Sequence, residues 1–198
     1  MLKNILNQVA KGAATPAGKG ALAGAGISLL SELLMGNKRT GSIGRTAGTA
    51  ALGALAFAAM NKWQAGKGSP QTQVATLNFD AMPPQDQKAH NRALLSAVVA
   101  AAKADGVFDA DERKHIQEQV EKTGDPEMMA WAQQEISKPL DVDAIAAMAT
   151  TPAMAAELYL ASFVTIGQPN EPERKYLDLL ANKLNIDPQL QQELEKQV

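Results

Sequence analysis

From residue 84 to the C-terminus, apolar residues recur at intervals of three and four, the spacing of one face of an α-helix. No run in this region alternates apolar and polar residues as a half-buried β-strand does. We therefore expect an all-α domain whose apolar faces share one core. Three of these faces contain Leu94, Ala97, Val98 and Ala101; Leu158, Ala161, Phe163 and Val164; and Leu177, Leu180, Ala181 and Leu184.

Capping residues followed by proline mark several helix starts, because proline suits the first helical position. These pairs are Asp125-Pro126, Thr151-Pro152 and Asp187-Pro188. Asp109 with Glu112, and Asn170 with Glu173, have the spacing of a capping box, and Gly106, Gly124 and Gly167 mark helix ends. The marks predict seven helices, at 84–104, 109–123, 126–137, 141–150, 152–166, 171–184 and 188–197.

An internal repeat relates two corners of this domain. At a shift of 61 residues, Gly106 aligns with Gly167, and the Glu-Arg-Lys of 112–114 aligns with that of 173–175. The segments DGVFDADERKHI and IGQPNEPERKYL thus look like two copies of one helix–loop–helix corner. Two copies are too few for a solenoid, so we expect a pseudo-twofold helical domain.

The N-terminal part has a different character. Two apolar stretches, 20–36 and 46–60, are rich in glycine and alanine, and Lys62 and Trp63 follow the second in the manner of an interfacial membrane anchor. The second stretch predicts a membrane-associated helix, although 16 uncharged residues span only about 24 Å against a hydrocarbon core of about 30 Å. Glu32 interrupts the first stretch. We divide the chain into a basic segment at 1–64, a linker at 65–83 and an acidic domain at 84–198.

Small residues in the basic segment have the spacing of close helix contacts. Gly20 and Gly24 form one GxxxG pattern, and Gly44 and Gly48 form another. The pattern makes a homo-oligomer through these helices a candidate assembly. It also leaves open an alternative, a soluble stress protein that self-associates through its glycine-rich N-terminal helices.

Charge separates the two parts. Residues 1–70 contain eight bases and one acid, a net charge of +7, whereas residues 71–198 contain 11 bases and 20 acids, a net charge of −9. The overall charge of −2 predicts no nucleic-acid partner. Basic residues near membrane segments favour the cytoplasmic side. We therefore predict an inner (cytoplasmic) membrane protein whose C-terminal domain is cytoplasmic if both apolar stretches insert as a hairpin. With one membrane span, the charge bias weakens or reverses.

Composition argues against most catalytic classes. The chain has no cysteine, which excludes disulfides, thiolate zinc sites and cysteine nucleophiles, and only two histidines, His90 and His115. No nucleophile–base pair and no glycine-rich phosphate loop is present. The sequence thus predicts a protein that is not an enzyme and has no catalytic residues and no organic cofactor.

One corner of the acidic domain concentrates carboxylates. They are Asp105, Asp109, Asp111 and Glu112. Carboxylate oxygens suit hard cations, so these residues form a candidate site for Ca²⁺, Mg²⁺ or Mn²⁺. The alternative is that Asp109 and Glu112 cap the following helix and that the other carboxylates favour its dipole.

The segment AAKADGVFDADERKHI, residues 101–116, resembles the TerB-like family of tellurite-resistance proteins. The apolar segment ending in Asn-Lys-Trp at 61–63 is similar to the YebE-type inner-membrane proteins of that superfamily. The resemblance implies a membrane-tethered TerB-like domain of seven helices with an internal repeat. It also implies a link to metal binding and stress responses. The function expected from it is a non-enzymatic module that binds an unidentified protein partner in envelope or metal stress, with a divalent cation as a candidate ligand.

Overall fold

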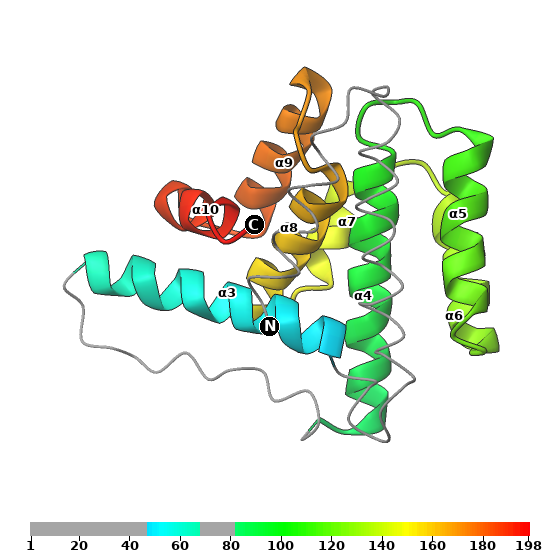
Figure 1. Ribbon diagram of the computed structural model, residues 1–198, viewed down its shortest axis with the longest axis horizontal. Coiled ribbons are helices and arrows are strands. Elements are labelled where there is room, and N and C mark those ends of the chain that lie inside the picture. The colour runs from blue at the N-terminus through cyan, green and yellow to red at the C-terminus, as the bar shows by residue number, and fades with distance from the viewer. Residues whose placement is uncertain (1–46, 68–81) are drawn as a thin grey trace.

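Helices account for nearly all of the chain that the structure describes. The computed structural model describes residues 47–67 and 82–198, and these ranges contain eight helices and no strand (Figure 1). The helices are α3 (Ala47–Gly66), α4 (Pro84–Ala102), α5 (Ala110–Glu121), α6 (Pro126–Ser137), α7 (Val142–Ala147), α8 (Pro152–Ile166), α9 (Glu171–Lys183) and α10 (Pro188–Glu195). The predicted all-α fold is confirmed.

The helices from residue 84 onward lie within the predicted ranges, because local capping sets their boundaries. The side chain of Asp125 accepts hydrogen bonds from the first-turn amides of α6, and Thr151 and Asp187 do the same for α8 and α10. Gly106 and Gly124 have φ angles of 81° and 67°, which favour glycine after a helix. The helices end up to three residues before their predicted ends. The pseudo-twofold relation between the two corners stays a prediction.

The centre of the core is the contact between α4 and α8. Leu94 and Leu95 of α4 and Leu158 and Leu160 of α8 are fully buried. Helix α8 is apolar on most of its circumference, and a helix of this kind must be covered on several sides. Helices α3, α9 and α10 supply that cover, so α8 is the most enclosed element of the described chain.

A hairpin of α5 and α6 lies on the other side of α4 (Figure 1). Trp131 of α6 donates a hydrogen bond from Nε1 to Oγ of Ser96 in α4, at 2.9 Å. The Nζ of Lys103 bonds the carbonyl oxygens of Glu135 and Lys138 at the C-terminal end of α6. A positive charge at this end complements the helix dipole. The hairpin is thus held to α4 by α6 and projects from the core.

Helix α3 packs across α8 and α10 (Figure 1). Its residues Leu52, Ala56, Ala59 and Met60 are buried in the same hydrophobic core as the helices that follow residue 84. The sequence places residues 47–64 in the N-terminal segment and predicts no contact between them and the acidic domain. The structure therefore adds an intramolecular contact surface for this segment.

Within residues 47–67 and 82–198, no helix combines the length and the apolar character needed to cross a membrane. The apolar stretch at 20–36, Glu32 and the glycines at 20, 24 and 44 lie outside the described residues. The predictions that depend on them therefore stay predictions.

Candidate functional site

The first acidic corner is built around the start of α5. Asp109 is the N-cap, and its Oδ1 accepts hydrogen bonds from the amides of Asp111 and Glu112 at 2.9 and 2.8 Å. Glu112 completes the capping box, since its Oε2 accepts a bond from the Asp109 amide. Asp105 accepts a bond from the Val107 amide at 2.8 Å. These carboxylates thus satisfy backbone amides of the corner.

The second corner repeats this arrangement at the start of α9. The side chain of Asn170 accepts a bond from the Glu173 amide, and Glu173 bonds back to the Asn170 amide at 2.7 Å. The two corners lie at the same end of the molecule (Figure 1). Burial raises the pKa of Glu112, and the nearby charges of Asp109, Asp105 and Glu173 raise it further. The charge of Glu173 is the smallest of these influences, so the second corner affects the pKa of Glu112 only slightly.

In the part of the chain that the structure describes, no group of three or more His, Asp or Glu side chains is arranged to hold a metal ion. The candidate cation site at Asp105, Asp109, Asp111 and Glu112 stays a prediction. The geometry shows instead what two of these side chains do without a metal, because Asp109 and Glu112 form a complete capping box.

The capping role predicts a contrast between two substitutions at one position. Asp109→Asn should leave the free energy of unfolding almost unchanged, because asparagine caps about as well as aspartate. Asp109→Ala should lower it by about 0.5–2 kcal/mol. Urea unfolding followed by circular dichroism measures both. A large loss of unfolding free energy in Asp109→Asn would contradict a pure capping role. It would show that the negative charge at position 109 is needed.

A buried ion pair joins α4 to α8. His90 Nε2 lies 2.9 Å from Glu157 Oε2, and only 4% and 3% of the two side chains are exposed. Buried polar groups of this kind are retained when each has a polar neighbour, because removal from water is costly. Sequence reasoning gave His90 no role. The available signal was Glu157, the one charged residue in the otherwise apolar helix α8.

Helix α3 covers this pair closely. Gly53 of α3 approaches Glu157 so nearly that a Cβ atom at position 53 would lie 2.9 Å from Oε1 of Glu157. Real Cβ atoms essentially never make so short a contact, so a larger residue at position 53 forces the carboxylate or α3 to move. Three helices therefore meet at the His90–Glu157 pair.

The C-terminal end of α3 is held to α10 by polar contacts, which we call the latch. Trp63 donates a hydrogen bond from Nε1 to Oδ1 of Asp187 at 3.3 Å, and Lys67 pairs with Oδ2 of the same residue at 2.9 Å. Lys62 pairs with Glu193 at 2.7 Å. Lys67 also lies over the Trp63 ring, 4.2 Å from its centroid. The latch gives Lys62 and Trp63 intramolecular partners, while their predicted role as a membrane anchor stays a prediction.

The latch carboxylates are stabilised in their charged form. The hydrogen bond from Lys67 lowers the pKa of Asp187, and hydrogen bonds from Lys196 and then Lys62 lower the pKa of Glu193. A carboxylate with a lowered pKa in the folded state contributes stability above its unfolded pKa and loses it as the pH falls through the folded value. The latch is therefore complete at neutral pH.

One family model matches a range of residues that includes the latch, the buried pair and both corners. The model of a family described as "Protein of unknown function (DUF533)" matches residues 17–198. The chain belongs to the DUF533 family. No curated protein and no solved structure matches this DUF533 chain.

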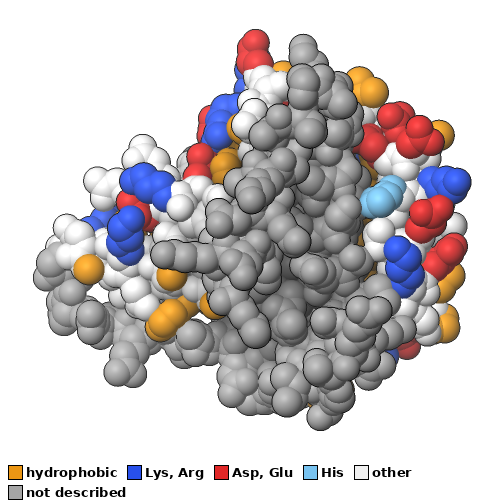
Figure 2. All heavy atoms as spheres, in the orientation of Figure 1, with side chains coloured by type: hydrophobic (Ala, Val, Ile, Leu, Met, Phe, Trp, Pro, Cys, Tyr) orange, Lys and Arg blue, Asp and Glu red, His pale blue; other side chains and the backbone are white. Residues whose placement is uncertain are grey.

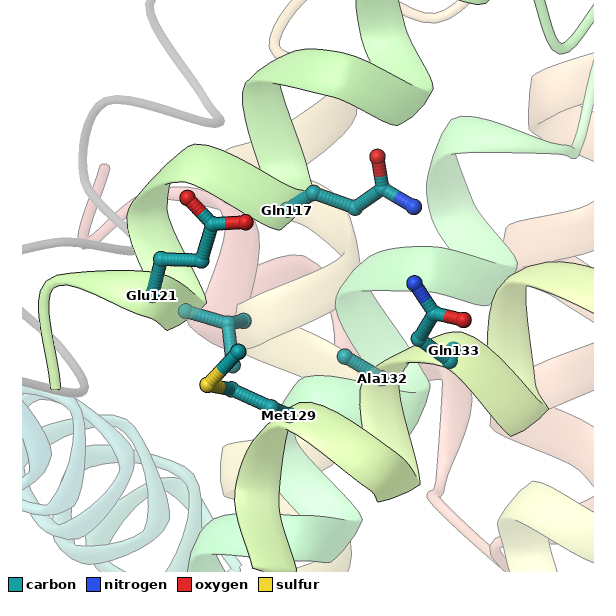
Figure 3. A pocket seen from close by; sticks show the side chains of 6 residues that line it. Gln117, Glu121, Met129, Ala132 and Gln133 are labelled. Atoms are coloured by element: carbon teal, nitrogen blue, oxygen red, sulfur yellow. The ribbon is translucent and has the colours of Figure 1, made fainter. Parts of the chain in front are cut away.

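A shallow pocket lies between α5 and α6 of the DUF533 domain (Figure 3). Its volume is about 20 Å³, which holds a single water molecule. Figure 3 shows side chains from both helices around it, and the lining residues are Gln117, Val120, Glu121, Met129, Ala132 and Gln133. The pocket is too small for an organic substrate. The exposed Met129 beside it is a flexible apolar side chain on this surface of the hairpin.

Several other histidine, methionine and tryptophan side chains contact their neighbours within the fold. His115 is half-buried on α5, where its Nε2 lies 3.3 Å from Nε2 of Gln119. Met128 and Met154 are buried in the core, and Trp131 is half-buried against α4. Met129 is the one methionine among the exposed large hydrophobic residues of the described chain.

Proposed function

We propose that this DUF533 protein is a non-enzymatic, TerB-like helical module that associates with the inner membrane and presents its acidic domain to a protein partner. The observation that carries the membrane part is the character of α3. No charged residue occurs between Ala47 and Asn61, and two lysines follow at 62 and 67. An apolar helix with a basic end suits an anionic bilayer surface.

The TerB-like part of the proposal is supported by the corner at 101–116. This segment forms a helix, a turn at Gly106 and a second helix that opens with a capping box. The corner at Asn170 repeats the capping box. Both features agree with a domain built from duplicated helical corners. The YebE-type relationship belongs to the same proposal and rests on the Asn-Lys-Trp segment at 61–63.

The α5–α6 hairpin is the surface that we propose for the partner. It projects from the core, and acidic and basic side chains are interspersed over it (Figures 1 and 2). The hairpin contains the exposed Met129 beside Gln117 and Gln133. A surface that mixes acidic, basic and polar side chains around an exposed methionine is suited to a protein interface. It lacks the excess of basic side chains that a nucleic-acid interface needs. The non-enzymatic part of the proposal rests on the sequence, which lacks a readable catalytic constellation.

Cell fractionation of the full chain tests the proposed membrane association. We expect the protein in the membrane fraction after a wash at physiological salt, and a fragment of residues 84–198 in the soluble fraction. Protease treatment of spheroplasts should leave the C-terminal domain intact if it is cytoplasmic. Recovery of the full chain in the soluble fraction as a defined oligomer would overturn the proposal and favour the soluble, self-associating alternative.

A further inference from the structure

Helix α3 is apolar on the side that faces away from the core as well as on the side that packs. Ala54 and Ala58 are exposed, and Phe57 between them is half-buried. A surface helix ordinarily carries charged residues on its outer face. The outer face of α3 carries none until Lys62. This face therefore suits an apolar neighbour better than it suits water.

The inner face of α3 makes close contacts with small side chains. Ala56 and Ala59 are almost completely buried, and Gly53 allows the close approach to Glu157. Alanine and glycine remove little apolar surface from water, so each contributes less to docking than a leucine would. Met60 and Leu52 are the larger buried anchors of the helix. The apolar part of the docking therefore comes mainly from Leu52 and Met60 rather than from the small side chains.

The latch that completes the docking is electrostatic and accessible to solvent. The Lys62 side chain is 60% exposed and that of Lys67 is 39% exposed. Their carboxylate partners are less exposed, at 17% for Glu193 and 35% for Asp187, but ion pairs that solvent reaches from the lysine side are weakened by salt. Both lysines bind carboxylates of α10, and lipid phosphates offer the same negative charge. An anionic bilayer thus competes with Asp187 and Glu193 for the same two side chains.

We propose that α3 is an exchangeable strap, which leaves α8 and α10 and lies in the surface of an anionic lipid bilayer. In the docked state the strap covers the His90–Glu157 pair and the adjoining faces of α8 and α10. In the lipid-bound state the apolar side chains of α3 lie in lipid, including those of the outer face that is exposed in the docked state, and Lys62 and Lys67 bind lipid phosphates at one end of the helix. Trp63 moves from Asp187 to the interface between lipid and water, where tryptophan is enriched. This inference rests on the membrane association proposed above.

Trp63 supplies a direct reporter of the exchange. The chain contains two tryptophans, so Trp131→Phe leaves Trp63 as the only one. We expect its fluorescence to be quenched by vesicles of phosphatidylglycerol and phosphatidylcholine with brominated acyl chains. Vesicles of brominated phosphatidylcholine alone should quench it far less. The matched control is Trp63→Phe, in which the remaining Trp131 on α6 should not be quenched.

The outcomes separate the strap from membrane association as such. Flotation of the full chain with anionic vesicles, without quenching of Trp63, would overturn the strap and leave the proposed function standing. Absence of flotation would overturn both. Weakening the latch gives a second measurement, made in the Trp131→Phe chain that retains Trp63 as its reporter. Asp187→Asn with Glu193→Gln keeps a capping side chain on α10, and it should raise vesicle binding roughly threefold to tenfold. Unchanged or weaker binding would contradict the exchange.

A reversible cross-link provides the sharpest control, because the natural chain has no cysteine. In the Trp131→Phe chain, cysteines introduced by Lys62→Cys and Glu193→Cys can be joined by a short bismaleimide linker that contains a cleavable disulfide. The locked protein should show no quenching by anionic vesicles, and reduction of the linker should restore it. Equal quenching before and after reduction would show that α3 does not need to leave α10, which overturns the strap.

Discussion

Replacing Glu157 with alanine is expected to lower the free energy of unfolding by about 3–5 kcal/mol, the typical cost of breaking a buried ion pair by removing one partner. The substitution leaves His90 Nε2 buried without the carboxylate that lies 2.9 Å away. It also removes the side chain over which Gly53 packs. Urea unfolding monitored by circular dichroism measures the change.

Two matched variants separate the causes of this loss. Glu157→Gln keeps the shape and a polar side chain beside His90 but removes the charge, so its cost should be smaller. The double variant His90→Leu with Glu157→Met replaces the pair with apolar side chains, and it should recover most of the stability lost in Glu157→Ala. A loss below about 1 kcal/mol in Glu157→Ala would be typical of an exposed pair. That result would contradict the burial of this pair beneath α3.

The positions of the helices could be predicted from the sequence because the signals that start and end them are local. Asp125 and Asp187 cap helices whose first residue is proline, and Gly124 turns the chain at positive φ. Each of these effects involves residues within one turn of the helix. The capping box at Asp109 was recognisable for the same reason, as an alternative to a cation site.

The buried pair could not be predicted, because His90 and Glu157 are far apart in sequence and meet only when α4 packs on α8. No spacing rule marks such a pair. A charged residue in the middle of an apolar helix was the one available signal, and it identifies Glu157 without naming its partner. The partner depends on the register of two helices.

The contacts of α3 could not be predicted from the sequence, for a different reason. An apolar run that ends in Lys62 and Trp63 suits the surface of a bilayer, and it equally suits a groove lined by α8 and α10. Composition does not distinguish the two surroundings, since both are apolar with a polar edge. What decides in the structure is the arrangement of Asp187 and Glu193 on α10, which lie more than a hundred residues further along the chain.

The contribution of α3 to the core leads to a large expected effect from one substitution in the full chain. Ala59→Glu should lower the free energy of unfolding by several kcal/mol, because Ala59 is fully buried and the new carboxylate would have no partner at the contact with α8 and α10. Ala58→Glu is the matched control. Ala58 is exposed one position earlier on the same helix, so the same change there should shift stability by about 0.5 kcal/mol or less.

Truncation measures the same contribution without introducing a charge. A fragment of residues 84–198 keeps the α4–α8 centre and should unfold cooperatively. It should melt roughly 20 °C lower than a chain of residues 47–198, because loss of Leu52, Met60 and Trp63 from the interface removes on the order of 5 kcal/mol of apolar burial. Thermal melting by circular dichroism compares the two. Equal melting temperatures, together with equal effects of Ala58→Glu and Ala59→Glu, would show that α3 adds nothing to the core. A large difference in both measurements would show that α3 stabilises the core by covering α8.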